Sequence, residues 1–347
     1  MLKDYRMKRK ILVIYTGGTI GMMKNAQTGA LEPFRFDDVY THLPMLRLID
    51  ATIAFEEMTP LIDSSDTNPE FWVKLADRIY QNYDSYDGFV ILHGTDTMAY
   101  TASALSFLLE NLAKPVILTG SQLPLGVIRT DGRENIVNSI EIAADTCEGK
   151  PRVPEVCICF GNALYRGNRA YKANAENFDA FTSANYPALA EIGTSVKYND
   201  SHIRELSKKQ LILHRHLDDN IAVLKIYPGI THQLVKTVLE TPGLRAVVLE
   251  TFGAGNAPTY KEFLSLLRQA AERGIVLVNV TQCKGGGGVE LGKYATSLAL
   301  QKIGVVSGYD LTTEAAVTKL MYLLGKDLSS EEVRRQMEVP ICGEMSV

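Results

Sequence analysis

Short apolar runs alternate along the chain with longer segments in which apolar residues recur at helical spacing. Each run ends in glycine or polar turn residues, which is typical of strands. Asn68-Pro69-Glu70 predicts a helix start, because asparagine caps a helix and proline suits its first position. Strand alternating with helix predicts a mainly parallel, doubly wound α/β sheet with helices on both faces. The predicted strands are 11–15, 89–92, 116–118, 156–160, 222–226, 246–249, 275–280 and 305–306, and further helices follow Asp96 and Gly132.

This rhythm is interrupted between residues 195 and 220, where the sequence is polar, charged and weakly periodic. A chain of 347 residues is also long for one core, because domains average about 150 residues. We therefore expect a larger N-terminal α/β domain over 1–195, a linker over 196–219 and a smaller C-terminal α/β domain over 220–347.

Charge restricts the class of partner. The formal net charge is −4, from 36 basic and 40 acidic residues, so no basic field would concentrate nucleic acid or an anionic membrane. The expected ligand is a small molecule. The apolar run 11–15 follows basic residues, as in an export signal, but it is too short for one, and no later segment predicts a membrane span.

Cysteine usage is consistent with the cytoplasm. Five cysteines are an odd number, and a long chain with an ordinary core needs no disulfide framework, so a reducing compartment is expected. Cys157 and Cys159 alternate along the predicted strand 156–160 without a neighbouring Cys or His cluster. We interpret them as buried apolar side chains and expect no structural metal.

Polar residues follow three predicted strands at their carboxyl ends, where ligands of open parallel sheets bind. The segments are "TGGT" at 16–19, "HGTDT" at 93–97 and "TGSQ" at 119–122. A glycine turn of this kind suits either a phosphate or a nucleophile, but none of the three carries the lysine of a phosphate loop. Two other glycine patterns, at 253–256 and 287–294, lack a complete nucleotide fingerprint and are interpreted as loops.

The alternative chemistry is acyl transfer by a threonine hydroxyl, which needs a proton acceptor and fixed donors for the developing oxyanion. Asp96 stands at a helix start that favours the carboxylate, so it suits a substrate ammonium. The stretch Ser64-Ser65-Asp66 offers hydroxyls and N–H groups to a carboxylate. Together these parts describe a site for an amino acid that carries a cleavable side-chain acyl group.

Several motifs carry a family resemblance over nearly the whole chain, from about residue 10 to about residue 325. "YTGGTIG" and "GFVILHGTDTMAYTASALSF" closely resemble the two signatures of the bacterial-type L-asparaginases, and the lack of an export signal favours the cytosolic type I branch. The resemblance implies hydrolysis of L-asparagine to L-aspartate and ammonia through an acyl-threonine, without metal or cofactor, in a homodimer or a homotetramer. Further matching blocks, in the same order, are "KPVILTGSQLP", "RTDGRENIVNSI", "NRAYKANAENFDAF" and "GNAP".

The resemblance assigns catalytic roles position by position. Thr19 matches the nucleophile. Thr95, Asp96 and Lys172 match a second triad, in which the threonine activates the attacking group or water and the lysine holds the proton network. Without the resemblance, the two threonines would be interpreted as turn and helix-cap residues and Lys172 as a solvated surface lysine.

The resemblance also assigns substrate contacts. Ser64 and Ser65 match the stretch that binds the α-carboxylate of the substrate, while Thr95 and Asp96 are expected to contact it as well, with Asp96 on the α-amino group. Asn256 matches a residue that reaches the site of a neighbouring subunit.

A tyrosine is missing from the expected lid. Many relatives place one after the glycine turn, where its hydroxyl closes over the nucleophile, but residues 22–33 read "MMKNAQTGALEP". Tyr309 in "GVVSGYDLTTEAA" is the candidate to replace it, because it follows a late apolar run and some cytosolic relatives resemble this segment. Packing of Tyr309 at a turn is the alternative interpretation.

Two rival functions use the same scaffold. One is a transfer RNA-dependent amidotransferase subunit, whose family carries an N-terminal extension that this sequence is expected to lack. The other is a catalytically silent amino-acid sensor, which would need the binding groups but not both threonines and Lys172.

Overall fold

The structure is a computed structural model that describes residues 8–24, 31–33 and 39–347. It divides into two compact units, which are described one at a time. The first contains the chain up to Ser183 together with Pro187–Leu213, and the second contains Ala184–Tyr186 and His214–Val347. Part of the expected lid, residues 25–30, lies outside the described residues.

The first unit is built on a mixed, mostly parallel sheet. Its strands are β1 (Arg9–Tyr15), β4 (Ala51–Glu57), β5 (Gly88–Leu92), β7 (Val116–Thr119), β10 (Val156–Phe160), β11 (Ala163–Arg166), β14 (Ala190–Ile192) and β15 (Val196–Tyr198). Among the described residues they pair in the order β15-β14-β11-β10-β7-β5-β1-β4, parallel from β10 to β4 and antiparallel beyond β10. Tyr15 pairs with Leu92 and Leu92 with Thr119, so three carboxyl ends meet at one edge.

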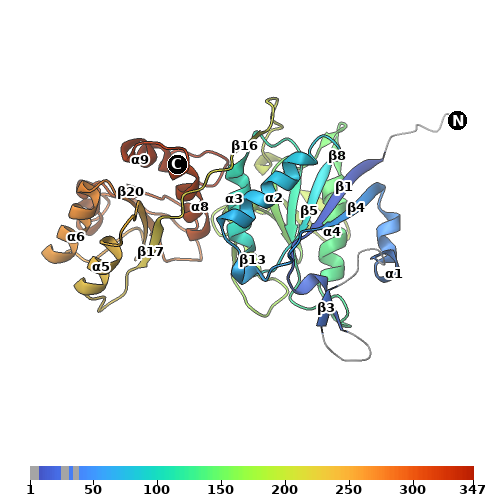
Figure 1. Ribbon diagram of the computed structural model, residues 1–347, viewed down its shortest axis with the longest axis horizontal. Coiled ribbons are helices and arrows are strands. Elements are labelled where there is room, and N and C mark those ends of the chain that lie inside the picture. Colours follow the sequence, from blue (N-terminus) through green and yellow to red (C-terminus); the bar gives the residue numbers. More distant parts are fainter. Residues whose placement is uncertain (1–7, 25–30, 34–38) are drawn as a thin grey trace. The chain divides into compact units, whose positions relative to one another are not determined.

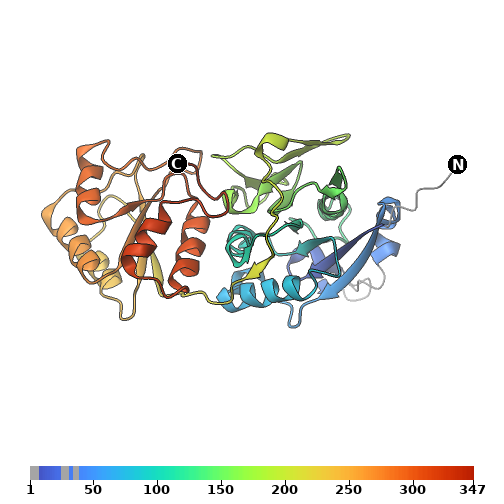
Figure 2. The same ribbon diagram turned by 90° about the horizontal axis from the view of Figure 1, so that it is seen from above.

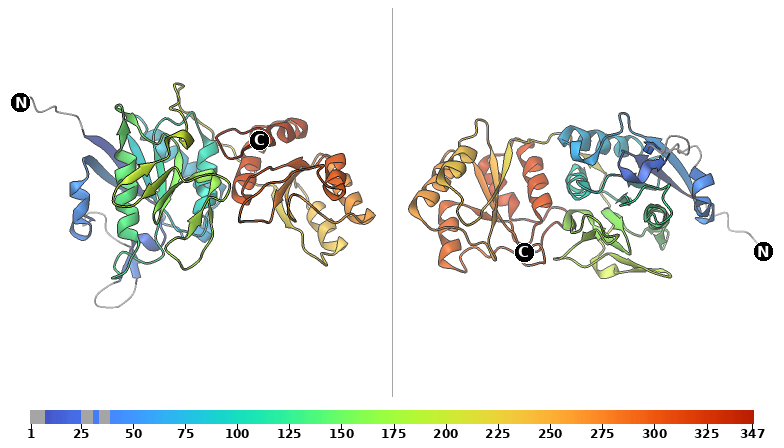
Figure 3. Two further views of the ribbon diagram at one scale, coloured as in Figure 1. Left: turned by 180° about the vertical axis from the view of Figure 1, so that it is seen from behind. Right: turned by 90° about the horizontal axis from the view of Figure 1, so that it is seen from below.

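Helices cover both faces of this sheet. α2 (Pro69–Gln81) and α3 (Met98–Leu108) pack on one face and α4 (Gly132–Ala144) on the other (Figures 1 and 3). The Asn68 side chain accepts a hydrogen bond from Phe71 N, which confirms the predicted cap of α2. α3 and α4 pack directly on the strands, whereas α2 packs mainly on α3, and the buried faces of all three helices contribute to the apolar core of this unit.

Small elements complete the first unit. The hairpin of β12 (Tyr171–Lys172) and β13 (Phe181–Thr182) lies outside the large sheet. Within the stretch 196–219, which the polar sequence assigns to a linker, the structure forms β15 and β16 (Ile212–Leu213), and β16 pairs with β6 (Leu109–Glu110). The other strands and the other α-helix that the structure describes in this unit are α1 (Val39–His42), β2 (Met22–Lys24), β3 (Leu31–Pro33), β8 (Thr146–Cys147) and β9 (Lys150–Pro151), and short 3-10 helices lie between them.

The second unit is a smaller, parallel α/β layer structure. Its strands are β17 (Ile221–Lys225), β18 (Ala246–Thr251), β19 (Val276–Thr281) and β20 (Val306–Ser307), paired in chain order within the described residues. Figure 2 shows helices on both faces of this sheet. One face carries α5 (His232–Leu239), α6 (Lys261–Glu272) and α7 (Ala295–Ile303), and the other carries α8 (Thr313–Leu324) and α9 (Ser330–Met337).

This architecture confirms the predicted α/β class, with a larger N-terminal and a smaller C-terminal part. The domain boundaries at 195 and 220 stay a prediction. Across the described ranges, no helix combines the length and apolar character that crossing a membrane requires.

A buried ion pair ties the end of the second unit to its core. Lys319 in α8 and Glu344 are both fully buried, with Nζ 2.8 Å from Oε1. Lys319 Nζ also donates to the backbone oxygens of Met337 and Val339, and Glu344 accepts from the N–H groups of Ile341 and Cys342. Burial lowers the pKa of Lys319, and the Glu344 carboxylate offsets part of that effect.

We expect Lys319→Met to lower the free energy of unfolding of this unit by about 3 kcal/mol, because it leaves the Glu344 charge buried without a counter-ion. The double variant Lys319→Met/Glu344→Gln should recover most of that loss. Hydrogen exchange at the amides of α8 measures the change. Arg335→Met, which breaks the exposed pair with Glu332, is the control and should change stability little. A single variant as stable as the wild type would contradict this account.

Candidate active site

The turn after β1 is bonded to the ends of two neighbouring strands. Thr16 donates from both N and Oγ1 to Leu92 O, each at 3.0 Å, and its own carbonyl accepts from Ile62 N. His93 N in turn donates to Thr119 O at 2.8 Å. Backbone hydrogen bonds therefore hold together the segments in which the sequence places its polar residues.

Two glycines let these turns touch. Gly18 has φ of 84°, and a Cβ built on it would lie 2.6 Å from Gly94 Cα. A Cβ on Gly94 would lie 2.5 Å from Ser64 Oγ. Both distances are closer than real Cβ contacts, so a side chain at either position would push the turns apart. The glycines next to Thr19 and Thr95 thus serve close backbone packing.

Lys172 bridges two of the predicted catalytic residues. Its Nζ donates to Thr95 Oγ1 at 2.7 Å and to Asp96 Oδ1 at 2.6 Å. The Lys172 side chain is 18% exposed, whereas that of Asp96 is 66% exposed. Lys172 is therefore not a solvated surface lysine. Its charge contacts a hydroxyl and a carboxylate in the turn that precedes α3.

The segment after β4 lies against the same turns. Ser64, which is buried, begins a short 3-10 helix, and its carbonyl accepts from the hydroxyls of Thr67 and Thr97 at 2.9 and 2.7 Å. Ser65 is exposed and donates from N and Oγ to Asp63 Oδ1. These two hydrogen bonds lower the pKa of Asp63.

Gln122 contacts the candidate site, although the sequence analysis placed it only at the edge of the sheet. Thr95 Oγ1 lies 3.5 Å from Gln122 Oε1, and Gln122 Nε2 donates to Asn177 O. The Asp131 carboxylate fixes this turn by accepting from the N–H groups of Gln122 and Leu123. Asp131 stands at the start of α4 but makes no capping hydrogen bond to that helix, so the capping rule does not predict its contact with the turn at Gln122.

His93 is buried and supports the segment of the second signature through hydrogen bonds. Its Nδ1 lies 2.7 Å from Gly94 O and its Nε2 lies 3.0 Å from Thr101 Oγ1, which also accepts from Trp72 Nε1. Because Gly94 O can only accept, the Nδ1–H tautomer satisfies this chain of contacts. Burial lowers the pKa of His93 to about 4, so the ring is neutral at ordinary pH.

Asn256 and Tyr309 belong to the second unit. Asn256 is half-buried after β18, and its Oδ1 accepts from Thr296 Oγ1. Tyr309 follows β20 in a left-handed backbone conformation, with φ of 47°. The predicted residues therefore fall into two sets: Thr19, Ser64, Ser65, Thr95, Asp96 and Lys172 in the first unit, and these two in the second.

Metal ligation finds no support among the described residues, where no group of three or more His, Cys, Asp and Glu side chains could hold an ion. Cys157 and Cys159 are fully buried in β10, as predicted. Burial raises the pKa of Cys159 to about 12, which keeps it a thiol.

Comparison with known proteins gives consistent matches. The model "Asparaginase, N-terminal" matches residues 10–204, and "Glutaminase/Asparaginase C-terminal domain" matches 220–337. The chain is 47% identical to L-asparaginase 1 of Escherichia coli (strain K12), covering 98% of each protein. It is 42% identical to the mouse 60 kDa lysophospholipase, covering 98% of this chain and 63% of that protein. The crystal structure of L-asparaginase I from Vibrio cholerae is similar with a TM-score of 0.88, at 44% identity, over 98% of this chain and all of that one.

The neutral His93 predicts a pH-dependent stability. Its pKa is about 4 when folded and about 6.5 when unfolded, so below pH 6.5 the unfolded chain binds a proton that the folded chain does not. Stability should therefore fall as the pH falls from 6.5 to 4. Over this interval, His93→Gln should lose about 3 kcal/mol less than the wild type.

Urea unfolding followed by Trp72 fluorescence measures this difference, because Trp72 is the single tryptophan and lies in the same unit. Carboxylate titration contributes equally to both proteins. Parallel stability curves for the two proteins would rule out a buried neutral His93.

Proposed function

Because the chain belongs to the asparaginase family, we propose that it is an L-asparaginase, an amidohydrolase that converts L-asparagine to L-aspartate and ammonia. The main structural support for this proposal is the position of Lys172, which lies within hydrogen-bond distance of both Thr95 and Asp96. A binding module would need a carboxylate for the substrate, but it would not need a lysine on a neighbouring hydroxyl.

The proposed nucleophile is Thr19. Its Oγ forms a bond to the side-chain amide carbon, the C–N bond breaks, and the nitrogen leaves as ammonia after gaining a proton. Water then attacks the resulting ester, which releases L-aspartate and restores the threonine hydroxyl. Both half-reactions need a group that accepts a proton from the attacking oxygen. Lys172 would take this role through Thr95 in its neutral amine form, in which the Nζ lone pair accepts the proton that the Thr95 hydroxyl passes on, and their contact supports this pairing.

The proposed substrate contacts use charge complementarity. The exposed Asp96 carboxylate would take the α-ammonium group, and Ser64 and Ser65 would take the α-carboxylate. For this, the N–H and hydroxyl of Ser65 would exchange Asp63 Oδ1, to which they donate in this structure, for the substrate. Contact of Gly94 with Ser64 supports one common site, because it brings the two segments together.

Two further residues are proposed to act from a neighbouring subunit. Asn256 would contact the substrate, and the Tyr309 hydroxyl would replace the hydroxyl missing from the lid at 22–33. These contacts require a homodimer or a homotetramer made of two dimers. We propose separately that the protein acts in the cytoplasm. No cofactor takes part in it.

The alternatives are less supported. An amino-acid sensor would need neither Thr19 nor the Lys172 contact, and an amidotransferase subunit would act on aminoacyl transfer RNA. Ammonia release from free L-asparagine separates both from the proposed enzyme, and binding without turnover would favour the sensor.

Thr19→Ala should abolish ammonia release while L-asparagine still binds, because the hydroxyl forms the acyl bond and adds little to affinity. An ammonia assay measures turnover, and calorimetry measures binding. Thr194→Ala, at an exposed site, is the control and should keep full activity. Activity of Thr19→Ala near that of the control would exclude Thr19 as the nucleophile.

Lys172→Met keeps the length of the side chain and removes its charge. We expect a loss of at least about 10²-fold in kcat, the lower range for a positioned proton-transfer group. Lys197→Met removes a charge from an exposed strand and should leave kcat unchanged. A loss of less than about 3-fold in Lys172→Met would argue for a structural lysine.

A further inference from the structure

Tyr309 holds a backbone conformation that a bulky side chain rarely adopts. Its φ of 47° lies in the left-handed region, where a side chain other than that of Gly, Asn or Asp is uncommon. Such strained residues persist where surrounding contacts fix them, and they cluster at functional sites. The contacts that fix this turn therefore bear on what Tyr309 does.

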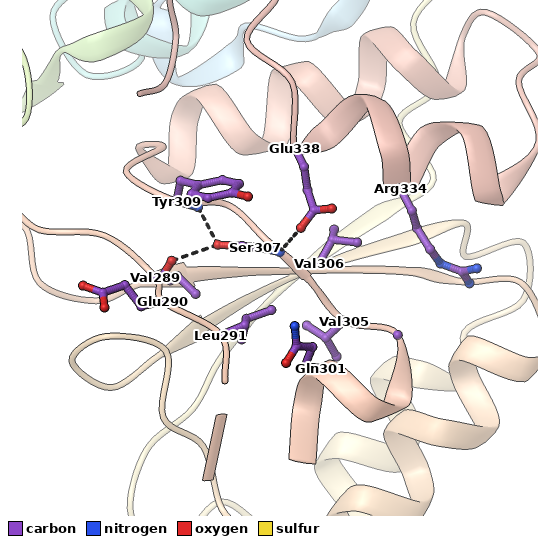
Figure 4. A pocket seen from close by; sticks show the side chains of 11 residues that line it. Val289, Glu290, Leu291, Gln301, Val305, Val306, Ser307, Tyr309, Arg334 and Glu338 are labelled. Atoms are coloured by element: carbon purple, nitrogen blue, oxygen red, sulfur yellow. Dashed lines mark hydrogen bonds between the residues drawn. The ribbon is translucent and has the colours of Figure 1, made fainter. Parts of the chain in front are cut away.

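Both backbone polar groups of Tyr309 are paired. Ser307 Oγ accepts from Tyr309 N at 3.0 Å and donates to Val289 O at 2.9 Å. Val289 N donates to Tyr309 O at 2.8 Å. Figure 4 shows Ser307 between the Val289 segment and the tyrosine. Ser307 thus links the end of β20 to the neighbouring loop.

Glu338 holds Ser307 from the opposite side. Glu338 Oε1 accepts from Ser307 N at 3.2 Å (Figure 4). Glu338 lies directly after α9, and the residues on either side of it, Met337 and Val339, give their carbonyl oxygens to Lys319 Nζ. The buried lysine therefore fixes the backbone from which the Glu338 carboxylate reaches Ser307.

The same segment contacts the turn a second time. Ser346 N donates to Asp310 Oδ1 at 2.7 Å, two residues beyond Glu344, the buried partner of Lys319. Segment 337–346 therefore contacts residues both before and after Tyr309. A cavity of about 430 Å³ adjoins the turn and is lined by Tyr309, Glu338 and Gln301 among others, so close packing does not enclose the ring on that side.

We propose that Glu338, anchored through Lys319, is a positioning residue that sets the Tyr309 turn for catalysis. The proposal rests on the proposed function, in which the Tyr309 hydroxyl takes part in the reaction. Glu338 touches no reacting atom in this account. It acts by keeping Ser307, and through it the Tyr309 backbone, in one geometry.

A double-mutant cycle on L-asparagine hydrolysis tests this. Tyr309→Phe removes only the hydroxyl and should lower kcat about 10-fold with unchanged melting temperature and oligomeric state. Glu338→Leu removes the acceptor for Ser307 N and should lower kcat about 5-fold, with KM within about 2-fold, because small displacements of a catalytic group are costly. In the Tyr309→Phe background, Glu338→Leu should cost less than about 2-fold more.

Two variants control the cycle. Glu338→Gln keeps an oxygen acceptor and should stay within about 2-fold of wild-type kcat. Arg335→Leu removes an exposed charge from α9, the helix that precedes Glu338, and should not change kcat. Melting temperature is recorded for every variant. If Glu338→Leu does not fold, Ser307→Ala completes the same cycle, because it removes the hydroxyl that accepts from Tyr309 N.

The outcomes distinguish the positioning role of Glu338 from the catalytic role of Tyr309. An equal fractional loss from Glu338→Leu with and without the Tyr309 hydroxyl would overturn the positioning role, and so would an unimpaired Glu338→Leu beside an impaired Tyr309→Phe. Full activity of Tyr309→Phe would overturn the catalytic role of Tyr309 and the positioning role together. It would leave the reaction assigned to Thr19 intact.

Discussion

Close backbone approach between turns is the constraint on which the first unit depends. The turn after β1 contacts Gly94, and Gly94 contacts Ser64, at distances that a Cβ on either glycine would not permit. Each strand can satisfy its hydrogen bonds without this contact, but the candidate site cannot form without it. Gly18 beside Thr19 and Gly94 beside Thr95 therefore have a packing role, although a glycine turn of this sequence pattern is equally compatible with a phosphate loop.

The fold was predictable where burial is two-sided. β1, β5, β7 and β10 are buried almost throughout, so they appear in the sequence as unbroken apolar runs. The sequence analysis did not predict β4, because this strand is half-buried and its sequence, "ATIAFEE", mixes polar and apolar residues. The antiparallel strands β11, β14 and β15 are three or four residues long, and their pairing depends on tertiary contacts that no local pattern encodes.

The candidate site was predictable in part, and for different reasons at different residues. Thr95 and Asp96 are adjacent in sequence and follow a strand, so their shared location follows from topology. Lys172 lies on a two-residue strand of a separate hairpin, 76 positions from Asp96, and only the family resemblance connected it to that carboxylate. The support from Asp131 and Glu338 depends on side chains that reach backbone N–H groups of other segments, which spacing does not reveal.

Lys172 divides one positive charge between two acceptors, which couples them electrostatically. The Asp96 carboxylate is mostly exposed and can bind a second cation, whereas the Thr95 hydroxyl lies in the less accessible part of the arrangement. A cation that neutralises Asp96 weakens its attraction for Nζ and leaves the ammonium more strongly directed at Thr95. The binding of a cation at Asp96 and the polarisation of the Thr95 hydroxyl therefore depend on the same lysine charge, so a change in one of these contacts alters the other.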